Sequence, residues 1–256
     1  MLNIIPIPAF KDNYIWALHD RQHAVVVDPG DAAPVRVWLD AQQLKLIAIL
    51  CTHHHHDHVG GICELVRLYN APVYGPRHED IPCLSHAVGD SDIVDIAELG
   101  ISLEVLDIPG HTRGHVAYTF PGAVFCGDTL FGCGCGRLFE GTTAQLHGSL
   151  QRLAQLPDTT RVYCAHEYTE ANIRFALACE PGNAQLKQRE VDTRALRAAG
   201  QPTLPSTIAL EKATNPFLRC TEAEIIRSVE RHTNTKLAAE NATAVFGALR
   251  EWRNTF

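Results

Sequence analysis

The chain has 256 residues, of which 46% are hydrophobic and 20% are charged, as in ordinary globular proteins. Its 22 Lys and Arg residues against 29 Asp and Glu residues leave a net charge of −7, which argues against a surface that binds nucleic acid or anionic membrane. No apolar run approaches the roughly 18 residues of a membrane-spanning helix, and no secretory signal is visible at the start. We therefore expect a cytoplasmic protein of one or two domains, with neither nucleic acid nor membrane as partner.

Cysteine and histidine are the unusual residue types. The nine cysteines are scattered and include no C-x-x-C pair, which predicts reduced thiols rather than a disulfide framework. Of the 14 histidines, five fall between His53 and His58. Because histidine is the commonest metal ligand, this cluster indicates a metal site.

The first half of the chain predicts strands joined by short connections. Apolar runs at 13–19 and 23–28 predict a hairpin, and Asp31 is placed to cap a helix that continues through Leu39. The almost wholly apolar run 44–51 predicts a strand buried on both faces. The remaining predicted elements are a helix at 62–69 and strands at 73–74, 101–108, 116–120, 123–126 and 161–165.

After about residue 165 the pattern becomes helical. Helices are predicted at 170–179, 184–199, 222–231 and 240–253, the third of them behind a capping box formed by Thr221 and Glu224. The segment 201–216 holds three prolines and few periodic apolar positions, so we expect a surface loop. The sequence thus predicts a mixed α/β domain over 1–169 and a smaller helical domain over 170–256.

The histidine cluster follows the predicted buried strand directly. His53 and His55 lie two residues apart, so in extended backbone their side chains point to the same face and can converge on one ion. Asp57 and His58 follow where the chain turns toward a helix, which lets them face a second point nearby. The intervening histidines should point elsewhere. A tag or a solvated loop is the alternative for such a run, but its place between a core strand and Gly60-Gly61 disfavours that interpretation.

Three more polar residues follow predicted strands. His111 comes after 101–108, Asp128 after 123–126 and His166 after 161–165. Each alone could be an ordinary loop residue, but together with the cluster they are candidate ligands, because sites in mixed sheets are built at strand ends.

The pattern Thr52-His53-x-His55-x-Asp57-His58, with the later histidines and aspartate, resembles the metallo-β-lactamase superfamily. Within it, the chain is similar to the glyoxalase II (hydroxyacylglutathione hydrolase) family. The segments that support this resemblance are 12–14, 27–31, 109–115, 127–136, 164–169, 205–207 and 215–219.

The resemblance implies an α+β fold, a four-layer αββα metallo-β-lactamase sandwich followed by a smaller C-terminal helical domain. It also implies two divalent metal ions, with zinc as the default and iron or manganese able to suit the same ligands. Asp28 could orient a ligand imidazole, or it could only serve a helix cap. The implied ligands are His53, His55 and His111 for one ion, Asp57, His58 and His166 for the other, and Asp128 as the bridge that also holds a metal-bridging hydroxide as nucleophile.

The implied substrate is a small-molecule glutathione thioester, S-D-lactoylglutathione, hydrolysed by a monomer to D-lactate and glutathione in the second step of methylglyoxal detoxification. Glutathione carries two carboxylates, so an acidic protein needs local cations. Arg137, Arg250 and Arg253 are the candidates, although each could be a solvated surface charge. Tyr168 would supply a hydroxyl, and Phe139 stands where many relatives carry Tyr, so one substrate hydrogen bond is expected to be missing.

Other functions remain open at this stage. A glutathione-persulfide dioxygenase of the same superfamily would use one iron and normally lacks so long a helical tail, and a lactonase shares the ligand motif. A non-catalytic zinc-binding module would close its coordination sphere, whereas seven ligands for two ions leave positions for water and substrate. Cys133 and Cys135 are expected to pack within their loop rather than to react.

Overall fold

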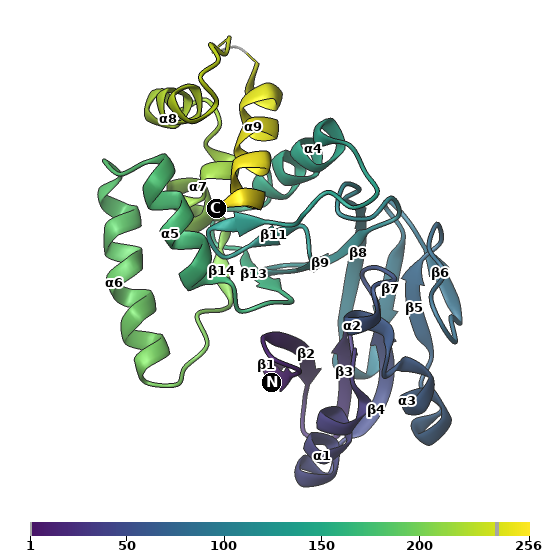
Figure 1. Ribbon diagram of the computed structural model, residues 1–256. Coiled ribbons are helices and arrows are strands. Elements are labelled where there is room, and N and C mark those ends of the chain that lie inside the picture. The colour runs from purple at the N-terminus through teal and green to yellow at the C-terminus, as the bar shows by residue number, and fades with distance from the viewer. Residues whose placement is uncertain (1, 239–240) are drawn as a thin grey trace.

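The computed structural model describes residues 2–238 and 241–256 (Figure 1). Within these residues, the strands form two six-stranded sheets and one two-stranded ribbon. The first sheet has the order β1 (Asn3–Ala9), β2 (Asn13–His19), β3 (His23–Val27), β4 (Lys45–Leu50), β5 (Val73–Pro76) and β6 (His86–Val88). The second has the order β14 (Ser206–Thr207), β13 (Arg161–Cys164), β10 (Ala123–Gly127), β9 (Val116–Phe120), β8 (Ile101–Asp107) and β7 (Ile93–Ile96).

The remaining elements are helices and the short ribbon. The ribbon pairs β11 (Leu130–Phe131) with β12 (Gly134–Cys135). The α-helices are α1 (Ala32–Gln42), α2 (His56–Val59), α3 (Ile62–Tyr69), α4 (Thr143–Ala154), α5 (Thr169–Cys179), α6 (Ala184–Ala198), α7 (Ile208–Thr214), α8 (Ala223–Thr233) and α9 (Ala242–Thr255). Short 3₁₀ helices lie at Ala97–Leu99 and Pro216–Leu218. No helix of the described residues combines the length and the apolar character that crossing a bilayer requires.

Two hydrophobic clusters follow from the alternation of side chains along the strands. In β2, Trp16 and Leu18 belong to the cluster that also holds Tyr118 and Phe125 of the second sheet, so this cluster fills the space between the sheets. The adjacent Ile15 belongs to the other cluster, which α1 and α3 cover on the opposite face of the first sheet. The layers are therefore those of the predicted αββα sandwich.

The C-terminal helices α5 to α9 gather beside α4 and the second sheet (Figure 1). Phe175 of α5 and Phe246 of α9 are buried in the same cluster as Phe125 of the sheet. The short strand β14 pairs antiparallel with β13, so the C-terminal part of the chain also adds an edge strand to the sheet. The division of the chain at residue 169/170 stays a prediction.

Most predicted elements lie where the sequence pattern placed them. The hairpins of β2 with β3 and of β9 with β10 are antiparallel, as expected. Asp31 caps α1 by accepting a 2.9 Å hydrogen bond from the Ala33 N–H. The expected helix start at 240 lies outside the described residues, and α9 is described from Ala242, with Asn241 as its cap.

Two local predictions are wrong. The segment expected to be a surface loop contains β14 and α7, because the Thr207 side chain caps this helix and Glu211 anchors it with a fully buried carboxylate. The capping box of Thr221 and Glu224 does not form, since α8 begins at Ala223 with Glu222 as cap and without a side-chain capping bond. Glu224 instead accepts a hydrogen bond from the Gly182 N–H at 3.0 Å.

The prediction that all cysteines are reduced thiols is also wrong. Cys63 of α3 and Cys83, in the connection between β5 and β6, form a disulfide with a Cα–Cα distance of 5.6 Å. Two cysteines 20 residues apart leave no local pattern in sequence, so only the fold shows that they meet. The other cysteines are buried free thiols. Cys133 and Cys135 are among them, and burial raises the pKa of Cys133 to about 12, as packing within the loop requires.

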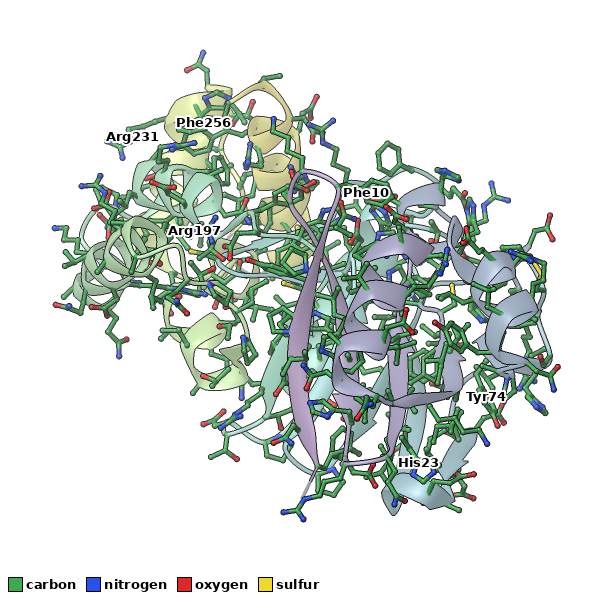
Figure 2. The ribbon with its side chains drawn as sticks, turned by 90° about the horizontal axis from the view of Figure 1, so that it is seen from below. Phe10, His23, Tyr74, Arg197, Arg231 and Phe256 are labelled. Carbon is green, nitrogen blue, oxygen red and sulfur yellow. A yellow bond between two sulfur atoms is a disulfide. The ribbon has the colours of Figure 1, made fainter. Side chains whose placement is uncertain are left out.

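The hairpin of β1 and β2 forms one edge of the first sheet, with Phe10 at its turn (Figure 2). The sequence analysis predicted β2 but not β1. Two prolines, Pro6 and Pro8, interrupt the β1 pattern, which is tolerable because β1 is the edge strand of its sheet.

Candidate metal centre

The seven candidate ligands of the sequence analysis lie together. The strands β4, β8, β10 and β13 each deliver the chain to the same place, at their carboxyl ends. The residues that meet there are His53, His55, Asp57 and His58 after β4, His111 after β8, Asp128 after β10 and His166 after β13.

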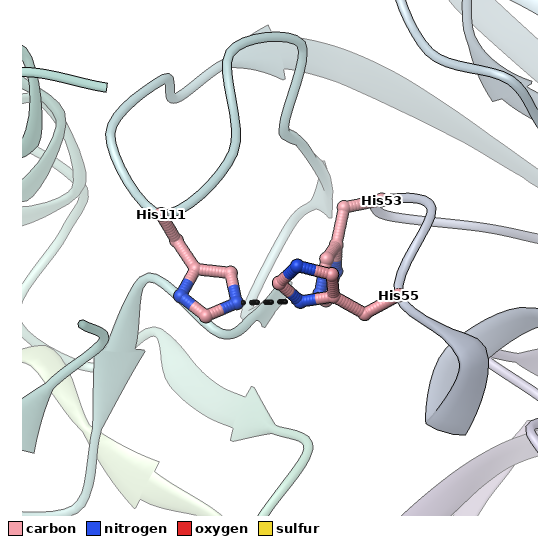
Figure 3. A group of neighbouring side chains, drawn as sticks. All are labelled: His53, His55 and His111. Carbon is pink, nitrogen blue, oxygen red and sulfur yellow. Dashed lines mark hydrogen bonds between the residues drawn. The ribbon is translucent and has the colours of Figure 1, made fainter. Parts of the chain in front are cut away.

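The first group consists of three imidazoles whose nitrogens converge (Figure 3). His55 Nδ1 lies 3.1 Å from His53 Nε2 and 3.0 Å from His111 Nε2. The neighbouring His54 points away and meets Glu140 at 2.7 Å, as expected. The arrangement therefore brings together the three residues that the resemblance assigns to one ion.

The second group consists of Asp57, His58 and His166. Asp57 Oδ2 lies 3.5 Å from His58 Nε2 and 3.4 Å from His166 Nε2. Asp128 stands between the groups: its Oδ1 is 3.5 Å from His58 Nε2, and its Oδ2 is 3.6 Å from His111 Nε2. The carboxylate is thus placed so that one oxygen faces each group.

Close approach of three loops positions Asp128. Its backbone N–H donates a 3.2 Å hydrogen bond to His115 Nε2. The preceding Gly127 has φ +47°, and a Cβ there would lie 2.3 Å from Thr52 Oγ1, so a side chain at this position would push the loops apart. Glycine is therefore required where the Asp128 loop passes the loop of the histidine cluster.

The donor set fits metal ions, because the ligand lone pairs point inward. His111 Nδ1 donates a 2.9 Å hydrogen bond to the Arg137 carbonyl, and His166 Nδ1 lies 2.9 Å from an Asp12 carboxylate oxygen. Their Nε2 atoms consequently face the cluster as acceptors. His58 Nε2 and Asp128 Oδ1 are buried and have no hydrogen-bond partner among the described residues. These two atoms lie 3.5 Å apart, close to the separation of about 3.4 Å that metal–ligand bonds of about 2.1 Å give in a tetrahedron.

The charges in the cluster also favour a cation. Burial opposes a charge on His58, but the Asp128 and Asp28 carboxylates raise the pKa of His58 well above its ordinary value. Burial likewise opposes a charge on His166, yet Asp128 raises the pKa of His166 to about 10. Burial and the charge of His58 instead hold the pKa of His53 well below its usual range. Positive charge is thus stabilised where an ion would sit, and metal must compete with protons there.

Asp28 lies beside the cluster, as the first of its two interpretations requires. Its Oδ2 is 3.1 Å from His58 Nδ1 and accepts a 2.8 Å hydrogen bond from the Thr52 hydroxyl. Its Oδ1 accepts a 2.7 Å hydrogen bond from the Thr52 N–H. Asp28 therefore contacts one imidazole of the second group directly and the loop of the first group through Thr52.

A cavity of about 500 Å³ opens beside the cluster at His111 and Asp128. All five residues that the resemblance assigned to the substrate line it. Its other lining residues are Phe131, Cys135, Ala171 and Asn172. The substrate candidates are Arg137, Phe139, Tyr168, Arg250 and Arg253.

The arginines of the cavity have neutral partners. Arg250 is 5% exposed and donates a 2.9 Å hydrogen bond to the Cys135 carbonyl. The alternative of a solvated surface charge is therefore wrong for this residue. Arg253 donates a 3.4 Å hydrogen bond to the side-chain oxygen of Asn172. Burial and the like charges of Arg250 and Arg137 lower the pKa of Arg253. Uncompensated positive charge in the cavity suits an anionic ligand.

Two aromatic rings of the cavity lie against ligand histidines. The Tyr168 ring stacks on His166 with centroids 4.7 Å apart. The Phe139 ring is 62% exposed and meets His55 at 5.4 Å and His111 at 5.2 Å, edge to face. Phe139 has no hydroxyl to offer a ligand, as the sequence analysis noted.

Several residues that position the cluster were not found from sequence. Asp12 and Asn13, from the first hairpin, contact His166 and Asp57. Glu79 accepts hydrogen bonds from two of the ligand-bearing loops. These residues lie far from most of the ligands in sequence; segment 12–14 supported the family resemblance, but no local pattern indicated that its side chains contact the ligands.

Comparison with known proteins places the chain in a family. Residues 10–166 match the family model of the metallo-beta-lactamase superfamily, and residues 167–256 match the model of the hydroxyacylglutathione hydrolase C-terminus. A hydroxyacylglutathione hydrolase of Methylobacillus flagellatus is 57% identical over 256 residues, with 100% of each chain covered. The chain belongs to the hydroxyacylglutathione hydrolase family.

Solved structures agree with this family's fold. The crystal structure of ETHE1 from Myxococcus xanthus shares 25% identity with a TM-score of 0.66 and covers 99% of both chains. The crystal structure of TTHA1623 in a di-iron-bound form shares 26% identity with a TM-score of 0.59, covering 84% of this chain and 100% of that chain. The metallo-β-lactamase fold with a C-terminal helical hydroxyacylglutathione hydrolase domain is thus confirmed.

Proposed function

We propose that this chain is a metal-dependent thiolester hydrolase that converts S-D-lactoylglutathione and water to D-lactate and glutathione. The observation that carries the proposal is the cavity, which is lined both by Asp128 and His111 of the cluster and by the three arginines. A glutathione thioester carries its reactive carbonyl on the central cysteine and a carboxylate at each end of the tripeptide, so it offers one group to the cluster and others to the arginines. The family membership supports the same activity.

The ligand set supports two divalent ions per chain. Zinc suits a mixture of imidazole and carboxylate ligands, and iron and manganese remain alternatives, as the di-iron form of the similar TTHA1623 structure illustrates. When bound, such ions lower the pKa of a coordinated water to roughly 7 and polarise a carbonyl oxygen. Asp128 would bridge the ions and hold the attacking hydroxide.

The chain's own residues bind and orient the substrate. Arg137 and Arg253 would attract the glutathione carboxylates, and Arg250 shapes the cavity by holding the Cys135 carbonyl at 2.9 Å. Tyr168 would offer a hydroxyl to the peptide part of glutathione. A thiolate is a good leaving group because it is much less basic than an amine, its conjugate thiol having a pKa of roughly 8.5. It needs no proton from a side chain as it leaves, so we assign no general acid.

The test is to measure hydrolysis of S-D-lactoylglutathione by the purified protein. The loss of thioester absorbance reports the reaction. We expect turnover with bound metal and none after chelation, with activity restored by zinc. Turnover that survives complete removal of metal would contradict the metal-dependent mechanism. Absence of turnover in protein with two bound ions would contradict the substrate. The cytoplasmic location and the monomeric state stay predictions.

A further inference from the structure

The two ligand groups differ in what stands behind their histidines. For two of the three histidines in the first group, the outer nitrogen meets a neutral oxygen: His111 Nδ1 meets the Arg137 carbonyl at 2.9 Å, and His53 Nδ1 meets the Thr52 hydroxyl at 3.1 Å. In the second group they meet carboxylates. His166 Nδ1 lies 2.9 Å from Asp12, and His58 Nδ1 lies 3.1 Å from Asp28.

The turn of the first hairpin supplies much of this difference. The turn follows Phe10, labelled in Figure 2, and the backbone after it is held against the His166 loop. The Tyr14 N–H donates a 2.7 Å hydrogen bond to the Ala165 carbonyl, and the Glu167 N–H donates one of 2.9 Å to the Asp12 carbonyl. The carboxylate of Asp12 is thereby placed on the His166 ring.

The next residue, at the start of β2, reaches another ligand of the second group. The buried Asn13 amide donates a 3.0 Å hydrogen bond to Asp57 Oδ2, the oxygen that also faces His58 and His166. Two consecutive side chains of one hairpin therefore contact two of the three ligands in the second group. Within the described part of the chain, both side chains form hydrogen bonds with this group and none with the first.

We propose that Asp12 and Asn13 are positioning residues that set the metal affinity of the second group, Asp57, His58 and His166, independently of the first. A carboxylate behind an imidazole raises its basicity and fixes the ring, and loss of such a partner typically lowers metal affinity 10–100-fold. The second group, with one carboxylate ligand and carboxylates behind both histidines, binds its ion more tightly than the first. This inference rests on the metal centre of the proposed function.

The test is a chelator competition with Zn²⁺ on metal-free protein, which resolves the two binding steps without any measurement of turnover. In the unchanged protein we expect two unequal dissociation constants. In Asp12→Asn, which keeps the side-chain volume and removes the charge, we expect the tighter step to weaken about 10-fold or more and the other to change less than about threefold. Asn13→Ala should weaken the same step.

The matched control is Asp95→Asn, which makes the same charge change at an exposed position on β7. It should leave both steps unchanged. Cobalt gives a second readout, since the absorption of Co²⁺ bound at one equivalent should differ between Asp12→Asn and the unchanged protein. Asp12→Glu should restore part of the lost affinity if the charge is what acts.

The outcomes separate the inference from the proposed function. Unchanged affinities in Asp12→Asn would overturn the positioning role, and so would equal weakening of both steps, which indicates general loosening of the fold. Protein that binds two ions with the expected unequal affinities but leaves the thioester intact would overturn the proposed function alone.

Discussion

The carboxylate of Glu79, in the connection after β5, accepts a 2.6 Å hydrogen bond from the backbone N–H of His54. It also accepts a 3.0 Å hydrogen bond from the Gly114 N–H and one from the Thr112 hydroxyl. One side chain thus joins the loop of His53 and His55 to the loop of His111. The first ligand group is held together by a residue that is not a ligand.

Replacing Glu79 by Ala should loosen this connection. Two backbone N–H groups would lose their acceptor, and each such loss costs roughly 1–3 kcal/mol when the group is buried. We expect the free energy of unfolding of the metal-free protein to fall by about 2 kcal/mol, measured in urea. Glu98→Ala, at an exposed position in the 3₁₀ helix Ala97–Leu99, is the control and should change it little. Equal stability of both variants would contradict the role of Glu79.

Asp128→Ala should remove bound metal and turnover together. Its two oxygens face different ligand groups, at 3.5 Å from His58 Nε2 and 3.6 Å from His111 Nε2, so neither group keeps its full set of ligands. Metal analysis after dialysis should find less than one ion per chain. A variant that retains two ions and normal activity would show that Asp128 does not bridge them.

Arg253→Ala should raise KM for the glutathione thioester while kcat and metal content stay nearly the same. Its guanidinium lines the cavity and donates a hydrogen bond to Asn172 rather than to a ligand of the cluster, so we expect it to contribute equally to binding the substrate and the transition state. Arg227→Ala, an exposed arginine of α8, serves as the control. If both variants keep the KM of the unchanged protein, Arg253 is only a surface charge.

The metal-free protein should lose stability as the pH rises above neutral. Although burial opposes it, Asp128 raises the pKa of His166 to about 10, whereas an unfolded histidine titrates near 6.5. The folded state therefore binds this proton more tightly, and the stabilisation is complete below about 6.5 and lost as the pH rises through about 10. Thermal unfolding of chelated protein between pH 7 and 10 tests this, and His166→Gln should flatten the dependence.

In the metal-bound protein, the pH dependence should run in the opposite direction. Protons and metal compete for the same nitrogens of His58 and His166, so metal affinity and activity should fall in acid. A metal affinity that is constant between pH 5 and 8 would contradict this competition.

The disulfide of Cys63 and Cys83 should add measurable stability. It closes a segment of 20 residues, for which the loss of chain entropy in the unfolded state amounts to about 3 kcal/mol. Cys63→Ser should lower the free energy of unfolding by that order in oxidised protein and have little effect in reductant. Thiol titration of the denatured, unreduced protein tests whether the disulfide is present. Nine reactive thiols would show that it is absent.

Local and periodic patterns predicted individual strands and candidate ligands, whereas the αββα fold and the full ligand set came from the family resemblance. The run before His53 has the pattern of a buried strand, and the spacing of His53 and His55 alone indicated convergence on one ion. The place of Arg250 and Arg253 on one helix face was also readable from their spacing.

The residues that support the ligands could not be predicted in this way. Asp12 and Asn13 act on residues more than 40 positions away, through a hairpin whose first strand was itself not predicted. Glu211 was placed in a loop because prolines dominate its surroundings, yet its carboxylate pairs with the buried Arg189 and accepts a 2.8 Å hydrogen bond from the Cys133 N–H. Such contacts depend on tertiary packing, which no local pattern encodes.

The most direct test of the central claim is a zinc titration of the metal-free protein in the presence of S-D-lactoylglutathione. The seven ligands around two positions predict that hydrolysis is absent without zinc, rises with added metal and reaches its maximum at about two ions per chain. Full hydrolysis before any metal is bound, or no hydrolysis once two ions are bound, would contradict the account.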